Sequence, residues 1–218
     1  MKISIPNLIT LGRLLLTLVV LLLLALFDAG SLESQRWLLL VCFWLCLAVA
    51  IGDALDGLVA RWLHQETSFG RVIDPVVDKV MICGAFIFFA SANFMHEGRS
   101  ITSVQPWMVI VIIMRELLVS GIRAHAESSG MDFGAAWAGK FKMFIQSVTV
   151  CLILGQLGWN LEGLAPLRVV CIWLTVIVTA LSIVAYVRRA HAFLLSRTAL
   201  AGADAAPHAD ESPAESNK

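Results

Sequence analysis

Residues 37–61, WLLLVCFWLCLAVAIGDALDGLVAR, decide how this chain folds. They begin with a long apolar run and end with Asp53, Asp56 and an arginine. The segment GRVIDPVVDK (70–79) has the opposite order, because Asp74 and Asp78 stand before the next apolar run. A membrane-spanning helix needs about 20 mostly apolar residues. The pattern therefore predicts two spanning helices whose carboxylates lie at the same side of a bilayer.

The composition places the chain in a membrane. Of its 218 residues, 59% are hydrophobic and 15% are charged, and the mean hydropathy is +0.83. A soluble domain carries about 25% charged residues. The five cysteines all fall inside apolar runs, which does not fit a secreted disulfide framework. We expect an integral membrane protein whose partners are lipids, and no nucleic-acid partner.

Six apolar segments are long enough to span, and short polar connectors separate them. The segments are residues 8–27, 37–60, 76–94, 106–124, 140–158 and 167–188. The predicted fold is all-α: a polytopic membrane protein with six transmembrane helices in a bundle, formed by residues 1–197. Residues 198–218 are rich in Ala, Asp, Glu, Ser and Pro without an apolar period, and are predicted to be a disordered cytoplasmic tail.

The distribution of basic residues predicts the orientation, because lysine and arginine favour the cytoplasmic side. With both termini inside, thirteen of the 16 lysines and arginines lie on the inner side. The other three are Arg36, Arg99 and Arg168. We predict a protein of the bacterial-type cytoplasmic (inner) membrane, with both termini and the carboxylate cluster at the cytoplasmic face.

The four aspartates have the spacing of a metal site. Asp53 and Asp56 share a helix face at i,i+3, and Asp74 and Asp78 share one at i,i+4. Converging carboxylates repel each other unless cations neutralise them, and hard oxygen ligands suit Mg²⁺, Mn²⁺ or Ca²⁺. Three alternatives stay open: Asp74 could cap a helix that begins at Pro75, Asp56 could pair with Arg61, and Asp78 could pair with a nearby basic residue.

The same residues carry a family resemblance. The pattern D-x2-D-G-x2-A-R-x8-G-x3-D-x3-D, which is complete here, resembles the signature of the CDP-alcohol phosphatidyltransferases. It is formed by Asp53, Asp56, Gly57, Ala60, Arg61, Gly70, Asp74 and Asp78. The resemblance implies a six-helix membrane bundle, a homodimer, and two Mg²⁺ or Mn²⁺ ions held by the aspartates. It also implies that Asp78 is the base for the acceptor hydroxyl, and that CMP is displaced from a CDP-linked lipid bound beside Gly57, Ala60, Arg61 and Gly70.

Two further segments extend the resemblance. IPNLITLGR is similar to a pattern on the nucleotide-binding side of such proteins, which would place Asn7, Thr10 and Arg13 near the CDP group. Alternatively, this is an interfacial helix start with a snorkelling arginine.

RELLVSGIR and GKFKMFIQ resemble the R-E-x-x-x-S-x-x-R and G-K-x-K-T-x-x-Q segments of phosphatidylglycerophosphate synthases, with Met143 in place of the usual threonine. They suggest a phosphate site for the acceptor formed by Arg115, Arg123, Lys140 and Lys142. The alternative for Arg123, Lys140 and Lys142 is charge that sets topology. Arg115 lies within an apolar helix and needs a partner such as Glu116 or a substrate phosphate.

The predicted function is therefore transfer of the phosphatidyl group of CDP-diacylglycerol to sn-glycerol 3-phosphate, which gives phosphatidylglycerol phosphate and CMP. The same chemistry could use inositol phosphate, a phospholipid or serine as the acceptor. Two more distant alternatives are an intramembrane prenyltransferase, which also uses Asp-rich clusters, and a cation transporter with a carboxylate site.

Overall fold

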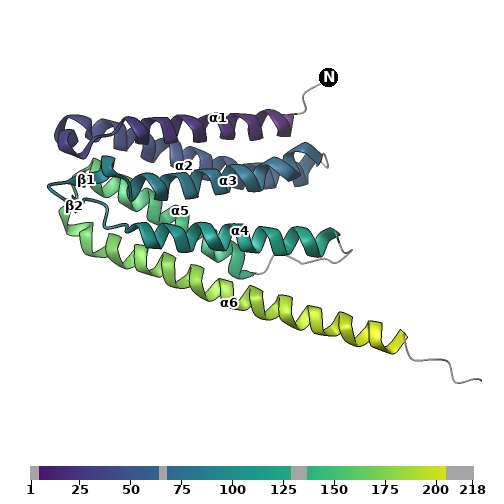
Figure 1. Cartoon of the computed structure of the whole chain (residues 1–218). Coiled ribbons are helices and arrows are strands. Elements are labelled where there is room, and N and C mark those ends of the chain that lie inside the picture. Colours follow the sequence, from purple (N-terminus) through teal and green to yellow (C-terminus); the bar gives the residue numbers. More distant parts are fainter. Residues whose placement is uncertain (1–4, 64–67, 129–136, 205–218) are drawn as a thin grey trace, which may run out of the picture.

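The computed structural model describes the backbone of residues 5–63, 68–128 and 137–204. Within these ranges it describes the side chains of residues 8, 10–52, 76–124 and 141–188. The described part is all-α apart from one small hairpin, as predicted, and all six predicted helices are present (Figure 1). They are α1 (Ile5–Leu26), α2 (Leu32–Leu63), α3 (Ser68–Phe89), α4 (Pro106–Ser128), α5 (Trp137–Gly158) and α6 (Ala165–Asp204).

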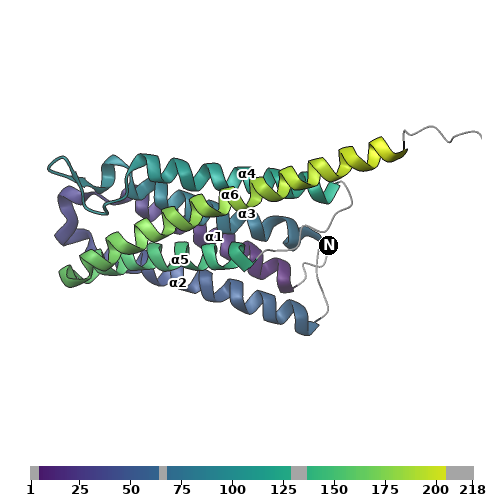
Figure 2. The same ribbon diagram turned by 90° about the horizontal axis from the view of Figure 1, so that it is seen from below.

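The helices pack as a closed ring. α1 contacts α2 and α3, α2 contacts α5, α5 contacts α6, α6 contacts α4, and α4 contacts α3. A further contact between α3 and α5 crosses the ring. Figures 1 and 2 show the helices running along one common direction, with α6 crossing the others obliquely and extending beyond them. Helices that are distant in the sequence, such as α2 and α5, therefore lie side by side.

The connectors between the helices are short. Three of them contain 3₁₀ turns, among them η1 (Ala29–Ser31) and η3 (Glu162–Leu164). Between α3 and α4 the chain forms η2 (Ala92–Phe94) and an antiparallel hairpin of β1 (Met95–His96) and β2 (Arg99–Ser100), which the sequence did not predict. We call this the hairpin end, and the opposite end, where α1 begins and α6 ends, the site end (Figure 1).

All six helices differ from their predicted bounds, and the ends of α3 and α6 are two clear cases. α3 was predicted to end at residue 94 but ends at Phe89. Just after this end, Ser91 Oγ donates to the Phe88 carbonyl at 2.7 Å. A hydroxyl that bonds the local backbone competes with helix continuation. The disordered tail was expected to begin at Thr198, but α6 continues past this residue to Asp204. The alanines of this stretch have high helix propensity. Residues 205–218 lie outside the described part.

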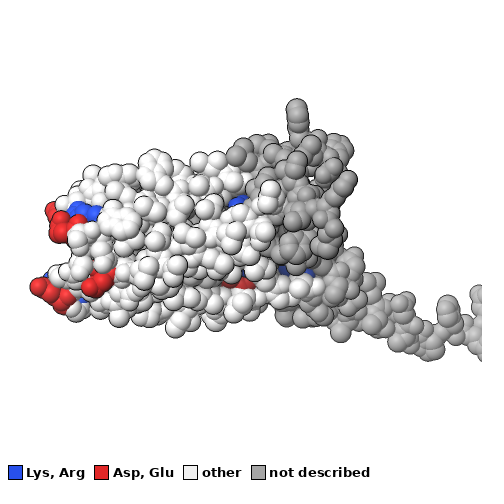
Figure 3. Space-filling model, turned by 90° about the horizontal axis from the view of Figure 1, so that it is seen from above, with Lys and Arg blue, Asp and Glu red and all other residues white. Residues whose placement is uncertain are grey.

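The surface and the hydropathy fit a membrane protein. Three segments within the described residues are long and apolar enough to cross a bilayer: Ala29–Gly52, Phe141–Gly158 and Glu162–Arg188. Thr10–Leu26 is a shorter apolar helix. Figure 3 shows a wide uncharged surface along the helices, with charged groups gathered at the hairpin end. Large apolar side chains such as Leu22, Ile110 and Leu181 are exposed, as lipid-facing residues are.

The hairpin end is held together by aromatic and polar contacts. The ring of Phe94 lies 4.5 Å from that of Phe27 and 5.5 Å from that of Phe89. Arg168, which the orientation count placed outside, is buried and donates to Gln156 Oε1 at 2.5 Å and to Ser103 Oγ at 3.3 Å. It therefore also joins α6 to α5 and to the connector before α4. All five cysteines are unbridged, as expected.

Candidate active site

The first part of the site is a polar stripe on α1. Thr10, Arg13 and Thr17 are buried, although most of this helix exposes leucines. Their spacing of three and four residues puts them on one helix face. Arg13, whose side chain is 3% exposed, donates from Nη2 to Oδ1 of Asp78 on α3 at 2.5 Å. This side chain therefore does not snorkel to solvent: it crosses from one helix to another.

Arg13 also lies against α2. A Cβ atom built on Gly52 would be 3.6 Å from both Cγ and Cδ of Arg13. The guanidinium thus connects α1 and α3 at the level of the residue that precedes Asp53. Gly52 of α2 and Asp78 of α3 therefore lie at the same arginine.

The helical backbone supports the predicted faces of the aspartates. α2 is continuous through Asp53 and Asp56, and α3 is continuous through Asp74 and Asp78. Because α3 begins at Ser68, Asp74 lies inside the helix, and the alternative that it caps a helix starting at Pro75 is wrong. The side chains of Asp53, Asp56 and Asp74 lie outside the described residues. Asp78 is the member of the predicted metal site whose side chain is described.

Several other predicted residues also lie outside the described side chains. They are Asn7, Gly57, Ala60, Arg61, Gly70 and Lys140. Their roles stay predictions.

A second cluster joins α4, α5 and α6. Glu116 is 7% exposed and pairs with Lys142 of α5, which is 2% exposed. Arg115 places Nη1 3.5 Å from both Glu116 oxygens, donates from Nε to Ser182 Oγ at 2.8 Å, and lies 5.4 Å from the ring centre of Tyr186. Buried charges need such partners because the apolar surroundings cannot solvate them. The prediction that Arg115 requires a partner such as Glu116 is confirmed.

The two parts of the site meet on α3. Lys79, the residue after Asp78, donates from Nζ to Ser120 Oγ of α4 at 2.6 Å, and Ser120 Oγ donates to the Glu116 carbonyl at 2.5 Å. Successive helix residues point about 100° apart, so Asp78 faces α1 while Lys79 faces α4. In Figure 3 a few charged atoms interrupt the uncharged surface beside the part drawn in grey.

Sequence reasoning placed Arg115, Arg123 and Lys142 in a phosphate site but did not name Lys79 or Glu116 as site residues. The available signal for Glu116 was a carboxylate within an apolar helix, which needs a counter-charge. Lys79 was counted only as a charge on the inner side. The ammonium group of Lys142 is buried against Glu116, and its role in binding the acceptor phosphate stays a prediction.

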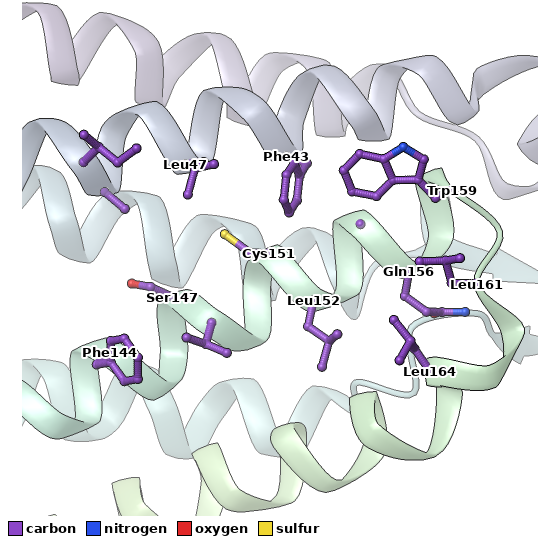
Figure 4. Close-up of a pocket in the computed structure, with 14 residues that line it drawn as sticks. Phe43, Leu47, Phe144, Ser147, Cys151, Leu152, Gln156, Trp159, Leu161 and Leu164 are labelled. Carbon is purple, nitrogen blue, oxygen red and sulfur yellow. The ribbon is translucent and has the colours of Figure 1, made fainter.

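An apolar groove borders the site on the surface of α2 and α5. It has a volume of about 620 Å³. Figure 4 shows side chains from both helices along it, among them Phe43, Leu47, Phe144 and Cys151, with Trp159 near the hairpin end. Its lining also includes Ile51, two residues before Asp53. The groove therefore extends from the level of Ile51 on α2 toward the hairpin end.

Comparison with known proteins identifies the class to which this fold and site belong. The family model for CDP-alcohol phosphatidyltransferase matches residues 3–181, so the chain belongs to that family.

Three relatives narrow the likeness. The chain is 32% identical over 185 residues to a CDP-diacylglycerol–glycerol-3-phosphate 3-phosphatidyltransferase of Bacillus subtilis, covering 82% of this chain and 91% of that protein. It is 35% identical over 189 residues to a probable phosphatidylglycerophosphate synthase of Mycobacterium tuberculosis, covering 86% and 81%. A CDP-diacylglycerol–glycerol-3-phosphate 3-phosphatidyltransferase of Pectobacterium atrosepticum is 28% identical over 200 residues, covering 89% and 99%.

Proposed function

We propose that the protein transfers the phosphatidyl group of CDP-diacylglycerol to sn-glycerol 3-phosphate, giving phosphatidylglycerol phosphate and CMP. Family membership and the names of the relatives support this reaction. The structural observation that carries the proposal is the position of Asp78 on α3. It lies between the arginine of α1 and a cationic cluster on α4 and α5. The proposed base thus stands next to the groups that can bind an anionic acceptor.

The bond changes follow from this arrangement. The acceptor hydroxyl oxygen attacks the phosphorus of the phosphatidyl group, and the pyrophosphate P–O bond to CMP breaks. Asp78 accepts the hydroxyl proton, as a carboxylate within hydrogen-bond reach can. Arg13 holds the Asp78 carboxylate in one orientation through Oδ1.

Asp53, Asp56, Asp74 and Asp78 would hold Mg²⁺ or Mn²⁺, and we propose two ions. The fit is supported by the continuous helices that carry both aspartate pairs and by the Arg13 side chain, which lies against Gly52 and bonds Asp78. When bound, such ions neutralise the pyrophosphate and stabilise in-line phosphoryl transfer.

The lipid substrate fits the groove beside the site. CDP-diacylglycerol has a charged head and apolar tails, and the groove runs along α2 from Ile51, near the first aspartate. We propose that an acyl chain occupies it while Asn7, Thr10, Arg13, Gly57, Ala60, Arg61 and Gly70 bind the CDP group.

Helix length supports a proposal for the number of membrane spans. The shortest of the six helices have 22 residues, about 33 Å at 1.5 Å per residue. This matches the hydrocarbon core of about 30 Å. We propose six spans in an inner membrane, with the site end and both termini in the cytoplasm. Family resemblance further suggests a homodimer, which cross-linking in membranes would test.

The cationic cluster favours a phosphorylated acceptor over serine. The test is CMP release by purified protein with CDP-diacylglycerol, Mg²⁺ and one acceptor at a time. Glycerol 3-phosphate should support the highest kcat/KM, above inositol phosphate, and serine should give no more than background. Higher efficiency with another acceptor, or prenyl transfer or metal flux without CMP release, would contradict the proposal.

A further inference from the structure

The buried ion pairs leave an unanswered question about the acceptor. Lys142 is bonded to Glu116, and Arg115 is held by Glu116, Ser182 and Tyr186. Both cations therefore have protein partners and are almost inaccessible to solvent. A phosphate that enters from water needs cations that are partly exposed and have no carboxylate attached.

Lys79 and Arg123 have these properties. Both are partly exposed, and Lys79 donates to a neutral hydroxyl, that of Ser120. Arg123 keeps its Nε buried without a hydrogen-bond partner among the described residues. Ser120 and Arg123 are three residues apart on α4 and share a face, so the Lys79 ammonium lies one turn from the Arg123 side chain. The two cations, and Arg115, are close enough to repel one another.

The charge of this region fits a dianion. Four described cations, Lys79, Arg115, Arg123 and Lys142, lie in this region with two described carboxylates, Glu116 and Asp78, so the net charge of these six groups is +2. Like charges gathered at the edge of an apolar bundle are unfavourable unless an anion joins them. Phosphate monoesters supply two negative charges and acceptor oxygens for charge-assisted hydrogen bonds.

We propose that Lys79 binds the phosphate of the acceptor together with Arg123, and that Ser120 is a positioning residue for Lys79. Arg115, Glu116 and Lys142 then form the buried support beneath them. This inference rests on the proposed function. It names Lys79 as the residue that links the Arg13–Asp78 contact to the cluster on α4, α5 and α6. Lys79 and the proposed base Asp78 are consecutive residues of α3, so the proposed phosphate site and the proposed base lie at the same level of the bundle.

The test compares Lys79→Gln with Lys79→Arg. Glutamine can still donate a hydrogen bond to Ser120 but has no charge. Arginine keeps both the hydrogen bond and the positive charge. With the wild-type enzyme turning over, Lys79→Gln should raise the KM for glycerol 3-phosphate about 10- to 100-fold, as expected for one lost charge-assisted hydrogen bond. In the same variant, the KM for CDP-diacylglycerol should change by less than about twofold. Lys79→Arg should recover most of the loss.

Arg99→Gln is the matched control, because it removes an exposed cation at the hairpin end and should leave both KM values unchanged. Ser120→Ala supplies a second route if Lys79→Gln does not fold. It keeps every charge, and should raise the KM for glycerol 3-phosphate alone, by less than Lys79→Gln would.

Equal increases in both KM values, or a lower kcat with an unchanged acceptor KM, would show that Lys79 serves the nucleotide side and would overturn the inference. Unchanged values in every variant would also overturn it. A wild-type protein that releases no CMP with glycerol 3-phosphate would instead contradict the proposed function.

Discussion

At the scale of single residues, the contact between Arg13 and Asp78 organises the site. The two charges come from helices that are 65 positions apart in the chain, and the arginine is fully enclosed by the bundle. Breaking such a pair by removing one partner is costly because the other charge stays buried. The pair therefore fixes where the proposed base stands before any substrate binds.

Asp78→Asn should lower CMP release by at least about 100-fold, because the amide cannot accept the hydroxyl proton. Asparagine can still accept the Arg13 hydrogen bond, but it leaves the buried guanidinium without a counter-charge, so the unfolding midpoint in detergent should also fall. Asp28→Asn is the control: it makes the same chemical change in an exposed side chain at the other end of the bundle. A kcat for Asp78→Asn near that of the wild type would rule out Asp78 as the base.

Glu116 should be more important for stability than Lys142. Glu116→Gln leaves Lys142 buried without its carboxylate, at a cost of about 3–5 kcal/mol. The double variant Glu116→Gln/Lys142→Met removes the stranded charge, and should recover much of the loss. The measurement is the unfolding midpoint of the purified variants. A double variant less stable than Glu116→Gln would contradict this account of the pair.

The sequence predicted part of this residue-level picture. Spacing within one helix indicated the shared faces of the aspartates, and the position of Arg115 in an apolar helix indicated its need for Glu116. Pairs between helices, such as Lys142 with Glu116 or Lys79 with Ser120, could not be predicted because spacing does not show which helices are neighbours.

At the scale of elements, hydropathy predicted where helices lie better than where they end. An apolar run marks the part of a helix that lies in the bilayer, but the helix itself can continue through the polar residues on either side. α3 begins at Ser68, well before the apolar run, and so includes Asp74. α2 likewise continues to Leu63 through both of its aspartates. The hairpin was missed because its two strands are each two residues long.

The groove between α2 and α5 gives an element-scale prediction. Leu47→Trp would fill part of it, and should raise the KM for dioleoyl CDP-diacylglycerol several-fold more than the KM for a short-chain form. Leu22→Trp is the control because Leu22 is exposed on α1, away from the groove. Equal effects of Leu47→Trp on long and short chains would show that the groove does not hold an acyl chain.

At the scale of the whole molecule, the ring of helices brings the two clusters together. The order α1, α2, α5, α6, α4, α3 around the ring places α3 between the arginine of α1 and the cations of α4. This order was not predicted, since lipid-facing and buried faces of these helices are both apolar. The buried polar residues that mark the inward faces, such as Thr17, Thr149 and Thr175, became informative only once the helices were packed.

The proposed orientation predicts which end meets the cell exterior. Glu97→Cys, at the exposed hairpin turn, should react with a membrane-impermeant maleimide in intact cells. Lys218→Cys should react only after the cells are permeabilised. The native protein is a suitable background because its five cysteines lie within the helices. Labelling of Lys218→Cys, but not of Glu97→Cys, in intact cells would reverse the orientation.

The most direct test is the transfer of radiolabelled glycerol 3-phosphate into chloroform-extractable lipid by the purified protein, with CDP-diacylglycerol and Mg²⁺. We predict one labelled lipid molecule for each CMP released, loss of both products in EDTA, and recovery when excess Mg²⁺ is restored. CMP release without labelled lipid, or transfer that EDTA does not affect, would contradict the account.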